Sequence, residues 1–225
     1  MKKAQLFLIA CGIFSVALLG QSKKINLGVE LGPSYTFLWG NHFISENNDP
    51  TNGYAAGFAF QYNFSNLFSL HSNLAYEKKG TKSTANLRDD QGNFLGLFTV
   101  HNNLNYITLP VLARLSFGNK MKFFINTGPY VSFLAKQTYV HEAILELPEQ
   151  KYDGTDAFQG IDFGLSSGLG FTIPISDSFF FSLEARNNLG IYNISKLPLS
   201  YDGGLLTNST NLLLGFSYQF GQNLD

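Results

Sequence analysis

From residue 25 onward, apolar side chains recur at every second position in one segment after another. A period of two is typical of β-strands whose two faces meet different surroundings. Eight such segments can be delimited, at residues 25–37, 53–64, 68–77, 106–117, 123–133, 160–173, 179–191 and 211–220. The chain is therefore predicted to be an all-β protein with eight strands.

The connections between these segments alternate in length. Short ones lie near residues 65, 119 and 175. Long ones, rich in Asn, Asp, Gly, Ser and Thr, lie at 39–52, 80–97, 139–157 and 193–207. An even number of antiparallel strands, with short turns at one end and long loops at the other, is typical of outer-membrane barrels. We expect an eight-stranded, antiparallel, up-and-down transmembrane β-barrel of OmpA/OmpX-like architecture that presents four loops.

Two kinds of eight-stranded barrel would place the alternation in opposite ways. A soluble carrier is apolar inside, whereas a membrane barrel is apolar outside. The apolar face of the eight segments contains no Asp, Glu, Lys, Arg or His, and the other face is mostly Gly, Ser, Asn and Ala. Charged residues form only 14% of the chain, against about 25% in soluble domains. The apolar face is therefore predicted to meet lipid, and the small side chains to fill a narrow interior.

Charge and hydropathy exclude two other classes. With 15 Lys and Arg against 16 Asp and Glu, the chain lacks the basic surface that a nucleic-acid partner requires. No long apolar run follows the first twenty residues, so a helical membrane protein is excluded as well.

The first 22 residues resemble an export signal. Two lysines precede an uncharged apolar stretch, and the small residues Gly20 and Ser22 stand before the predicted cleavage site. Cleavage after Gly20, acylation of Cys11 and an uncleaved membrane anchor are the alternatives. Removal of residues 1–22 leaves a barrel domain at 23–225 that contains no cysteine.

Six charged residues fall on the polar face of the strands. They are Glu30, Glu77, Arg114, Asp162, Glu184 and Arg186. Charges in a narrow interior need partners, so we predict a polar cluster in the lumen. A proton or ion path is the functional alternative, but eight strands leave no open channel once side chains fill the interior.

Aromatic residues on the apolar face gather near both ends of the strands. Six lie beside the short turns: Phe64, Phe68, Phe117, Phe123, Phe179 and Phe220. Five lie toward the long loops: Tyr35, Phe37, Trp39, Tyr54 and Tyr76. Such clustering predicts two interfacial belts, periplasmic and outer, whereas ordinary core aromatics would not gather at strand ends.

Candidate chemistry is sparse. The four histidines, His42, His71, His101 and His141, show no metal-ligand spacing, so neither a metal nor a cofactor is predicted. A lipid-modifying enzyme could use His101 with a loop serine, but no Gly-x-Ser-x-Gly elbow is present. The acidic segment 139–157 lacks the spacing of a calcium loop and is interpreted as a solvated loop.

Several short motifs together resemble the PorT-like outer-membrane β-barrel family of Gram-negative bacteria. Leu-Ala-Tyr-Glu-Lys-Lys-Gly at 74–80 is similar to its Tyr-x-x-Lys-Gly strand end, and Tyr-Ile-Thr-Leu-Pro-Val-Leu-Ala-Arg at 106–114 to its proline-containing strand. Gly128-Pro-Tyr130, Asp162-Phe-Gly164 with Gly168-x-Gly170, and Gly215 to Phe220 follow in the family's order. The resemblance implies an outer-membrane location and no settled activity.

Two departures from the family pattern affect what can be inferred. Thr108 stands where the family usually has a glutamate, so one carboxylate of the lumen is missing there. Phe220 is followed by residues 221–225, whereas the aromatic residue read by the assembly machinery usually ends the chain.

The sequence thus predicts a non-enzymatic outer-membrane protein, multi-pass and monomeric, with periplasmic termini. Its loops would serve binding, envelope integrity or docking in a secretion apparatus. A lipid-modifying barrel enzyme, a narrow solute pore and a soluble carrier are the rivals. Expected partners are outer-membrane lipid, the barrel-assembly machinery during insertion and a secretion-system protein.

Overall fold

The computed structural model describes residues 24–143, 148–199 and 203–220, and the predicted signal peptide lies outside them. The elements are β1 (Ile25–Asn41), α2 (His42–Asn47), β2 (Thr51–Asn63), β3 (Phe68–Arg88), β4 (Phe94–Phe117), β5 (Lys122–His141), β6 (Gln150–Asp153), η2 (Thr155–Ala157), β7 (Ile161–Pro174), β8 (Phe179–Gly190) and β9 (Gly203–Phe220). Long strands therefore dominate the described chain.

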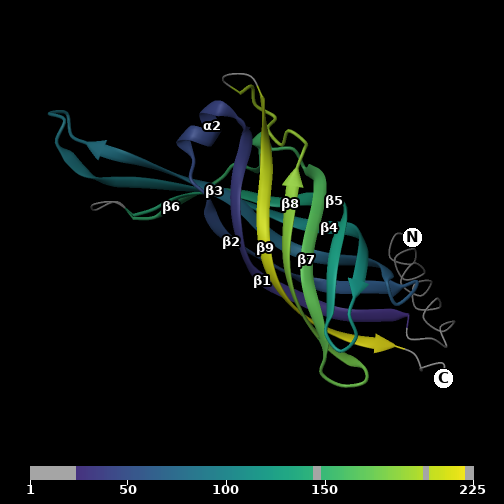
Figure 1. Ribbon diagram of the computed structural model, residues 1–225. Coiled ribbons are helices and arrows are strands. Elements are labelled where there is room, and N and C mark those ends of the chain that lie inside the picture. The colour runs from purple at the N-terminus through teal and green to yellow at the C-terminus, as the bar shows by residue number, and fades with distance from the viewer. Residues whose placement is uncertain (1–23, 144–147, 200–202, 221–225) are drawn as a thin grey trace, which may run out of the picture.

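Eight of these strands form a closed ring, and Figure 1 shows them from the side. Neighbours along the chain pair antiparallel, β5 pairs with β7, and β9 pairs back with β1. At this seam Ile25 lies opposite Phe220, and Leu31 lies opposite Leu214. Closure gives every strand a hydrogen-bonding partner on both sides, which a chain in hydrocarbon requires. The predicted eight-stranded antiparallel barrel is confirmed, with β6 an additional short strand beside β5.

The two faces of the strands point as the alternation predicted. Phe163 and Leu165 on β7 are 42% and 49% exposed on the outside, whereas Asp162 on the same strand is fully buried. The barrel is thus apolar outside and polar inside, which excludes the soluble carrier. Among the described residues, no helix combines the length and hydropathy needed to cross a membrane.

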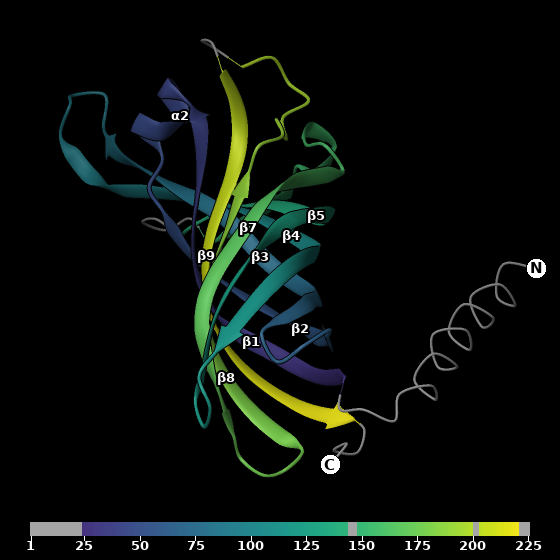
Figure 2. The ribbon, with the colours of Figure 1, turned by 45° about the vertical axis from the view of Figure 1, so that its right-hand side comes forward.

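The barrel has two unlike ends. At the turn end, connections of four residues at 64–67, 118–121 and 175–178 join the strands, and β1 begins beside the end of β9. Gly118 has a φ of 110°, a conformation that side chains with a Cβ rarely adopt, and it makes one of these turns possible. The loop end carries α2, which is labelled in Figure 2, together with β6, η2 and the segment 191–199.

The prediction of a long loop at residues 80–97 is wrong. Residues 80–97 do not form a loop, because β3 and β4 stay paired from Gly80 opposite Asn103 to Arg88 opposite Phe94. Only residues 89–93 connect them, and the Asp89 carboxylate accepts the N–H groups of Gln91 and Asn93 in that turn. In the β4 half of this ribbon, apolar residues fall on even positions (Phe94, Phe98) and on odd ones (Leu95, Leu97), so the sequence there shows no period of two.

Residues 83–99 form an arm that projects beyond the barrel (Figures 1 and 2). β2 pairs with β3 only as far as Lys78, and β5 pairs with β4 only as far as Val100. The other three predicted loops are also shorter than expected, because β1, β5 and β9 extend into them and α2, β6 and η2 occupy parts of them.

Candidate functional site

Buried polar side chains fill the barrel in two groups. The group nearer the turn end is named here the turn-side network, and its members are Glu30 on β1, His71 on β3, Arg114 on β4, and Glu184 and Arg186 on β8. Each lies on the polar parity of its strand, so the period of two alone directs it inward. The relative exposure of these five residues is between 2% and 6%.

The arginines of this network bridge its carboxylates. Arg186 donates through Nε to Glu184 Oε1 at 2.5 Å and through Nη2 to Glu30 Oε2 at 3.2 Å. Arg114 donates through Nη2 to Glu184 Oε2 at 2.9 Å. Two guanidinium groups therefore balance two carboxylates, and the contacts join β1, β4 and β8 across the barrel.

Gly168 makes room for this network. A Cβ atom at Gly168 would lie 2.7 Å from Glu184 Oε1 and 2.9 Å from Asn126 Oδ1. Asn126 Nδ2 itself donates to Glu184 at 3.2 Å. The small residues that the sequence places on the inner face are thus required where large ionic side chains lie opposite them.

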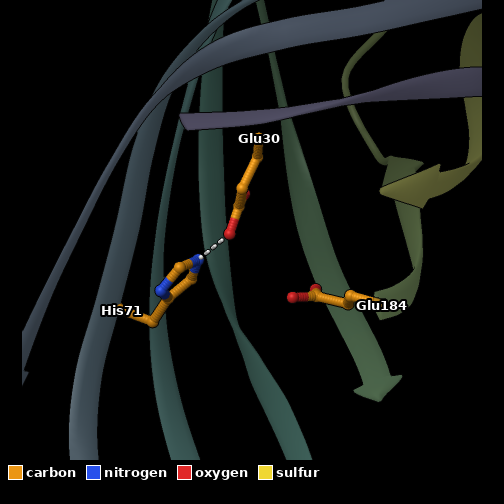
Figure 3. Close-up of side chains that lie close together, drawn as sticks. All are labelled: Glu30, His71 and Glu184. Atoms are coloured by element: carbon orange, nitrogen blue, oxygen red, sulfur yellow. Dashed lines mark ion pairs between the residues drawn. The ribbon is translucent and has the colours of Figure 1, made fainter. Parts of the chain in front are cut away.

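Glu30, His71 and Glu184 also present a set of possible metal ligands, shown in Figure 3. One ligand atom from each lies within 4.8 Å of the others, and His71 Nε2 is 3.1 Å from Glu30 Oε1. However, Arg186 donates to both carboxylates and its Nη2 lies 3.2 Å from His71 Nε2. The lone pairs that a cation would need are directed at guanidinium groups, so the geometry favours an ion-pair network over a metal site.

A second group, named here the loop-side network, surrounds Lys79. Its Nζ lies 3.0 Å from Asp162 Oδ2 and 3.9 Å from Glu77 Oε2. The same ammonium group lies 4.6 Å from the ring centre of Tyr130, and the Thr207 hydroxyl donates to Asp162 at 2.7 Å. Contacts from β3, β5, β7 and β9 thus meet at one buried cation.

Neutral polar groups complete the second network around Glu77. Its carboxylate accepts hydrogen bonds from Ser209 at 2.6 Å, Thr108 at 2.8 Å, and Asn188 and Asn211 at 3.1 Å. Thr108, which stands where the resembled family has a glutamate, therefore supplies a donor to the glutamate of the adjacent strand.

The six charged residues predicted for the lumen all lie inside, but not as one cluster. Glu30, Arg114, Glu184 and Arg186 belong to the turn-side network, whereas Glu77 and Asp162 belong to the loop-side network. Lys79 is not among the predicted residues, because the predicted strand ends at residue 77 whereas β3 continues to Arg88. The sequence around His71 shows no metal-ligand spacing, because its ionic partner Glu30 comes from a strand distant in sequence.

An apolar layer closes the interior above the loop-side network. It consists of Leu38, Leu104, Tyr106, Phe158, Ile194 and Leu205, none more than 7% exposed. Leu38, Leu104 and Leu205 lie on the parity that is polar elsewhere in their strands. That reversal near the strand ends is the sequence signal that could have revealed the layer.

The side chains of the two predicted aromatic belts differ in their exposure. All six phenylalanines beside the turns are exposed on the outside, by 39% to 57%. Toward the loop end, Tyr35, Tyr54 and Tyr76 are exposed by 53%, 49% and 38%. Phe37 and Trp39 are only half-buried neighbours further along β1, and the Trp39 indole donates to the carbonyl of Thr207.

Charged groups at the loop end pair locally. His101 Nε2 lies 2.6 Å from Glu142 Oε1, and this hydrogen bond holds the pKa of the Glu142 carboxyl below its usual value. Lys151 pairs with Glu149, and Lys136 with Asp153. Three carboxylates in the described part of segment 139–157 therefore each have a separate partner.

A closed, eight-stranded barrel with a lipid-facing apolar surface and a filled polar interior defines an integral outer-membrane protein of the small-barrel class. A family model described as an outer membrane protein beta-barrel domain matches residues 15–196. The chain therefore belongs to this outer-membrane β-barrel family, which places it in the outer membrane. No curated protein matches the chain significantly.

Several solved structures are similar in fold. Ail of Yersinia pestis, in complex with the heparin analogue sucrose octasulfate, shares 10% identity at a TM-score of 0.40, over 88% of this chain and 99% of that one. Neisserial surface protein A shares 12% identity at a TM-score of 0.46, over 86% of this chain and 97% of that one. OprG of Pseudomonas aeruginosa shares 11% identity at a TM-score of 0.48, over 90% of this chain and 99% of that one. Likeness at this level bears on neither ligand nor role.

Proposed function

We propose that this protein is a non-enzymatic, non-conducting outer-membrane protein that acts through its loop end. The observation that carries the proposal is the filled interior. The turn-side network, the loop-side network and the apolar layer lie one above another between the two ends of the barrel. A solute would have to displace all three to cross.

Contacts across the barrel make this filling hard to move. Arg186 and Glu30 join β8 to β1, and Lys79 and Asp162 join β3 to β7, all with less than 7% exposure. Separating either pair would leave buried charges without partners, which costs several kcal/mol. Tyr106 and Leu104 add a fully buried apolar barrier above them.

The surroundings of His101 support a role without catalysis. A lipid hydrolase of the serine type needs a serine hydroxyl within hydrogen-bond reach of its histidine. In the described part of the chain, His101 is engaged by Glu142 and by no serine. The carboxylates and arginines inside the barrel are buried and already paired, so they offer no accessible acid or base.

The loop end is the working surface under this proposal. Loops and hairpins on a rigid scaffold commonly carry recognition, and the arm at 83–99 projects from this end beyond the barrel (Figure 1). Short turns at the opposite end support an orientation with that end in the periplasm. The PorT-like resemblance of residues 74–80 and 106–114 supports assignment to that family, with docking to a secretion-system protein as one use of the surface.

Planar-bilayer recording of the refolded protein tests the proposal. We expect no current steps above the lipid baseline, with a general porin in the same bilayer system as the positive control. Folding is verified by the faster gel migration of unboiled barrel, and the same sample is assayed for fatty acid released from phospholipid vesicles. Reproducible conductance, or release of fatty acid that depends on the folded protein, would overturn the proposal.

A further inference from the structure

A pocket of about 360 Å³ opens at the loop end, directly above the apolar layer. Segments distant in sequence enclose it: β1, α2, β3, β4, β5, the turn around η2, residues 195–199 and β9. Its position separates it from both ionic networks, since neither Lys79 nor Arg186 lines it. It is therefore a feature of the loop end and not part of the filled lumen.

The floor and walls of this pocket are apolar. Leu38, Phe158 and Leu205 form the floor and belong to the buried apolar layer. Ile44 and Leu199 are half-buried walls packed against that layer. Apolar surface held open at a water-exposed end is the usual lining of a site for a small apolar molecule.

One side of the pocket is polar but uncharged. Asn48, Thr81, Ser83, Asn102 and Ser195 line it, and no lining residue is Asp, Glu, Lys, Arg or His. Thr81 and Ser83 donate to the carbonyls of residues 49 and 47. Asn102 Oδ1 accepts from Gln137 at 2.7 Å, which leaves the N–H donors of the same carboxamide for a ligand.

Size and lining together define the ligand class. An apolar cavity of about 150 Å³ holds benzene, and pockets for small ligands begin at about 300 Å³. We propose that this pocket binds a small, uncharged molecule of about two fused rings, with one hydroxyl or carbonyl oxygen that accepts a hydrogen bond from Asn102. An ionised ligand is disfavoured, because no opposite charge lines the pocket.

This inference deepens the proposed function, on which it rests: the ligand binds at the loop end and does not pass through the barrel. The buried layer below the pocket includes Leu104 and Tyr106, both fully buried, so the floor is closed. The site is therefore a receptor for the ligand and not the entrance of a channel.

Fluorine NMR of 6-fluoro-2-naphthol with the full barrel in lipid nanodiscs tests the inference. We expect saturable binding of one naphthol per barrel. Leu199→Asp should weaken it by at least about tenfold, because an unpaired carboxylate would be placed against the apolar lining. Val100→Phe, which fills the pocket without adding charge, should weaken it as well and serves if the first variant fails to fold.

Leu97→Asp is the matched control, since Leu97 is 59% exposed on the arm and does not line the pocket. It should bind the probe as the wild type does. Non-saturable partitioning of naphthol, or equal binding by all variants, would overturn the inference and leave the pocket to an apolar side chain of a partner protein. A barrel that conducts yet still binds naphthol here would instead refute the proposed function alone.

Discussion

The charged side chains of the turn-side network depend on one another because each has few other polar groups to pair with. Arg186 contacts both Glu30 and Glu184, whereas Arg114 contacts Glu184 and the side-chain oxygen of Gln61. In a buried setting, an ion pair adds little net stability, but removing one partner leaves an uncompensated charge. The structure therefore makes Arg186 the most sensitive member of the network.

Arg186→Met should lower the free energy of unfolding in lipid by about 3–5 kcal/mol, because Glu30 loses its arginine and Glu184 keeps only Arg114. Urea unfolding in vesicles measures this. Arg88→Met on the arm is the control, with an expected change within about 0.5 kcal/mol. Adding Glu30→Gln to Arg186→Met should restore part of the loss, and no restoration would show that packing, not charge, sets the cost.

Sequence alone gave the direction of these side chains but not their grouping. Parity placed Glu30 and Arg186 inside, because the period of two is fixed by strand geometry. Which inward residues meet depends on the stagger of the strands around the barrel, which no local pattern encodes. Only the strand register separates Glu77 and Asp162 from the turn-side network.

At the scale of elements, the alternation of apolar and polar residues stops where the strands leave the lipid-facing part of the barrel. β3 was predicted only to residue 77 and β4 only from residue 106, yet they pair up to Arg88 and Phe94. Beyond the lipid both faces of a strand meet water, so alternation is lost while backbone pairing continues. Lys79 and the apolar layer face the interior, but the alternation also fails there, because Lys78 on the outward parity is polar and Leu104 on the inward parity is apolar.

The arm should be dispensable for the stability of the barrel. Ala85 and Phe98 face each other in the ribbon, so residues 86–97 can be replaced by Asn-Gly, which closes two antiparallel strands directly. We expect the unfolding free energy to change by less than about 0.5 kcal/mol, because the removed residues pair only with one another. Failure to insert, or a loss of several kcal/mol in the same urea titration, would show that the arm supports the barrel.

At the scale of the whole molecule, stability depends on an uninterrupted apolar exterior. Leu165 lies on β7 between Pro129 of β5 and Leu189 of β8, and it is 49% exposed. Leu165→Arg should lower the unfolding free energy in bilayers by about 2–4 kcal/mol, as expected for a cation near mid-depth. Leu97→Arg, on the arm outside the barrel, should change it little. Equal stability of the two variants would contradict the assigned lipid face.

The turn-side network also bears on how the molecule is made. Glu30 comes from the first strand and Arg186 from the penultimate barrel strand, 156 residues later, and β9 lies between them. Arg186 has Glu184 on its own strand, but Glu30 has no arginine partner until the first and last strands meet, and an incomplete sheet would bring its carboxylate into hydrocarbon unneutralised. Closure of the β1–β9 seam and formation of the Glu30–Arg186 ion pair are thus a single event. During biogenesis we therefore expect the unassembled precursor and the closed barrel to be populated, with few open sheets between them.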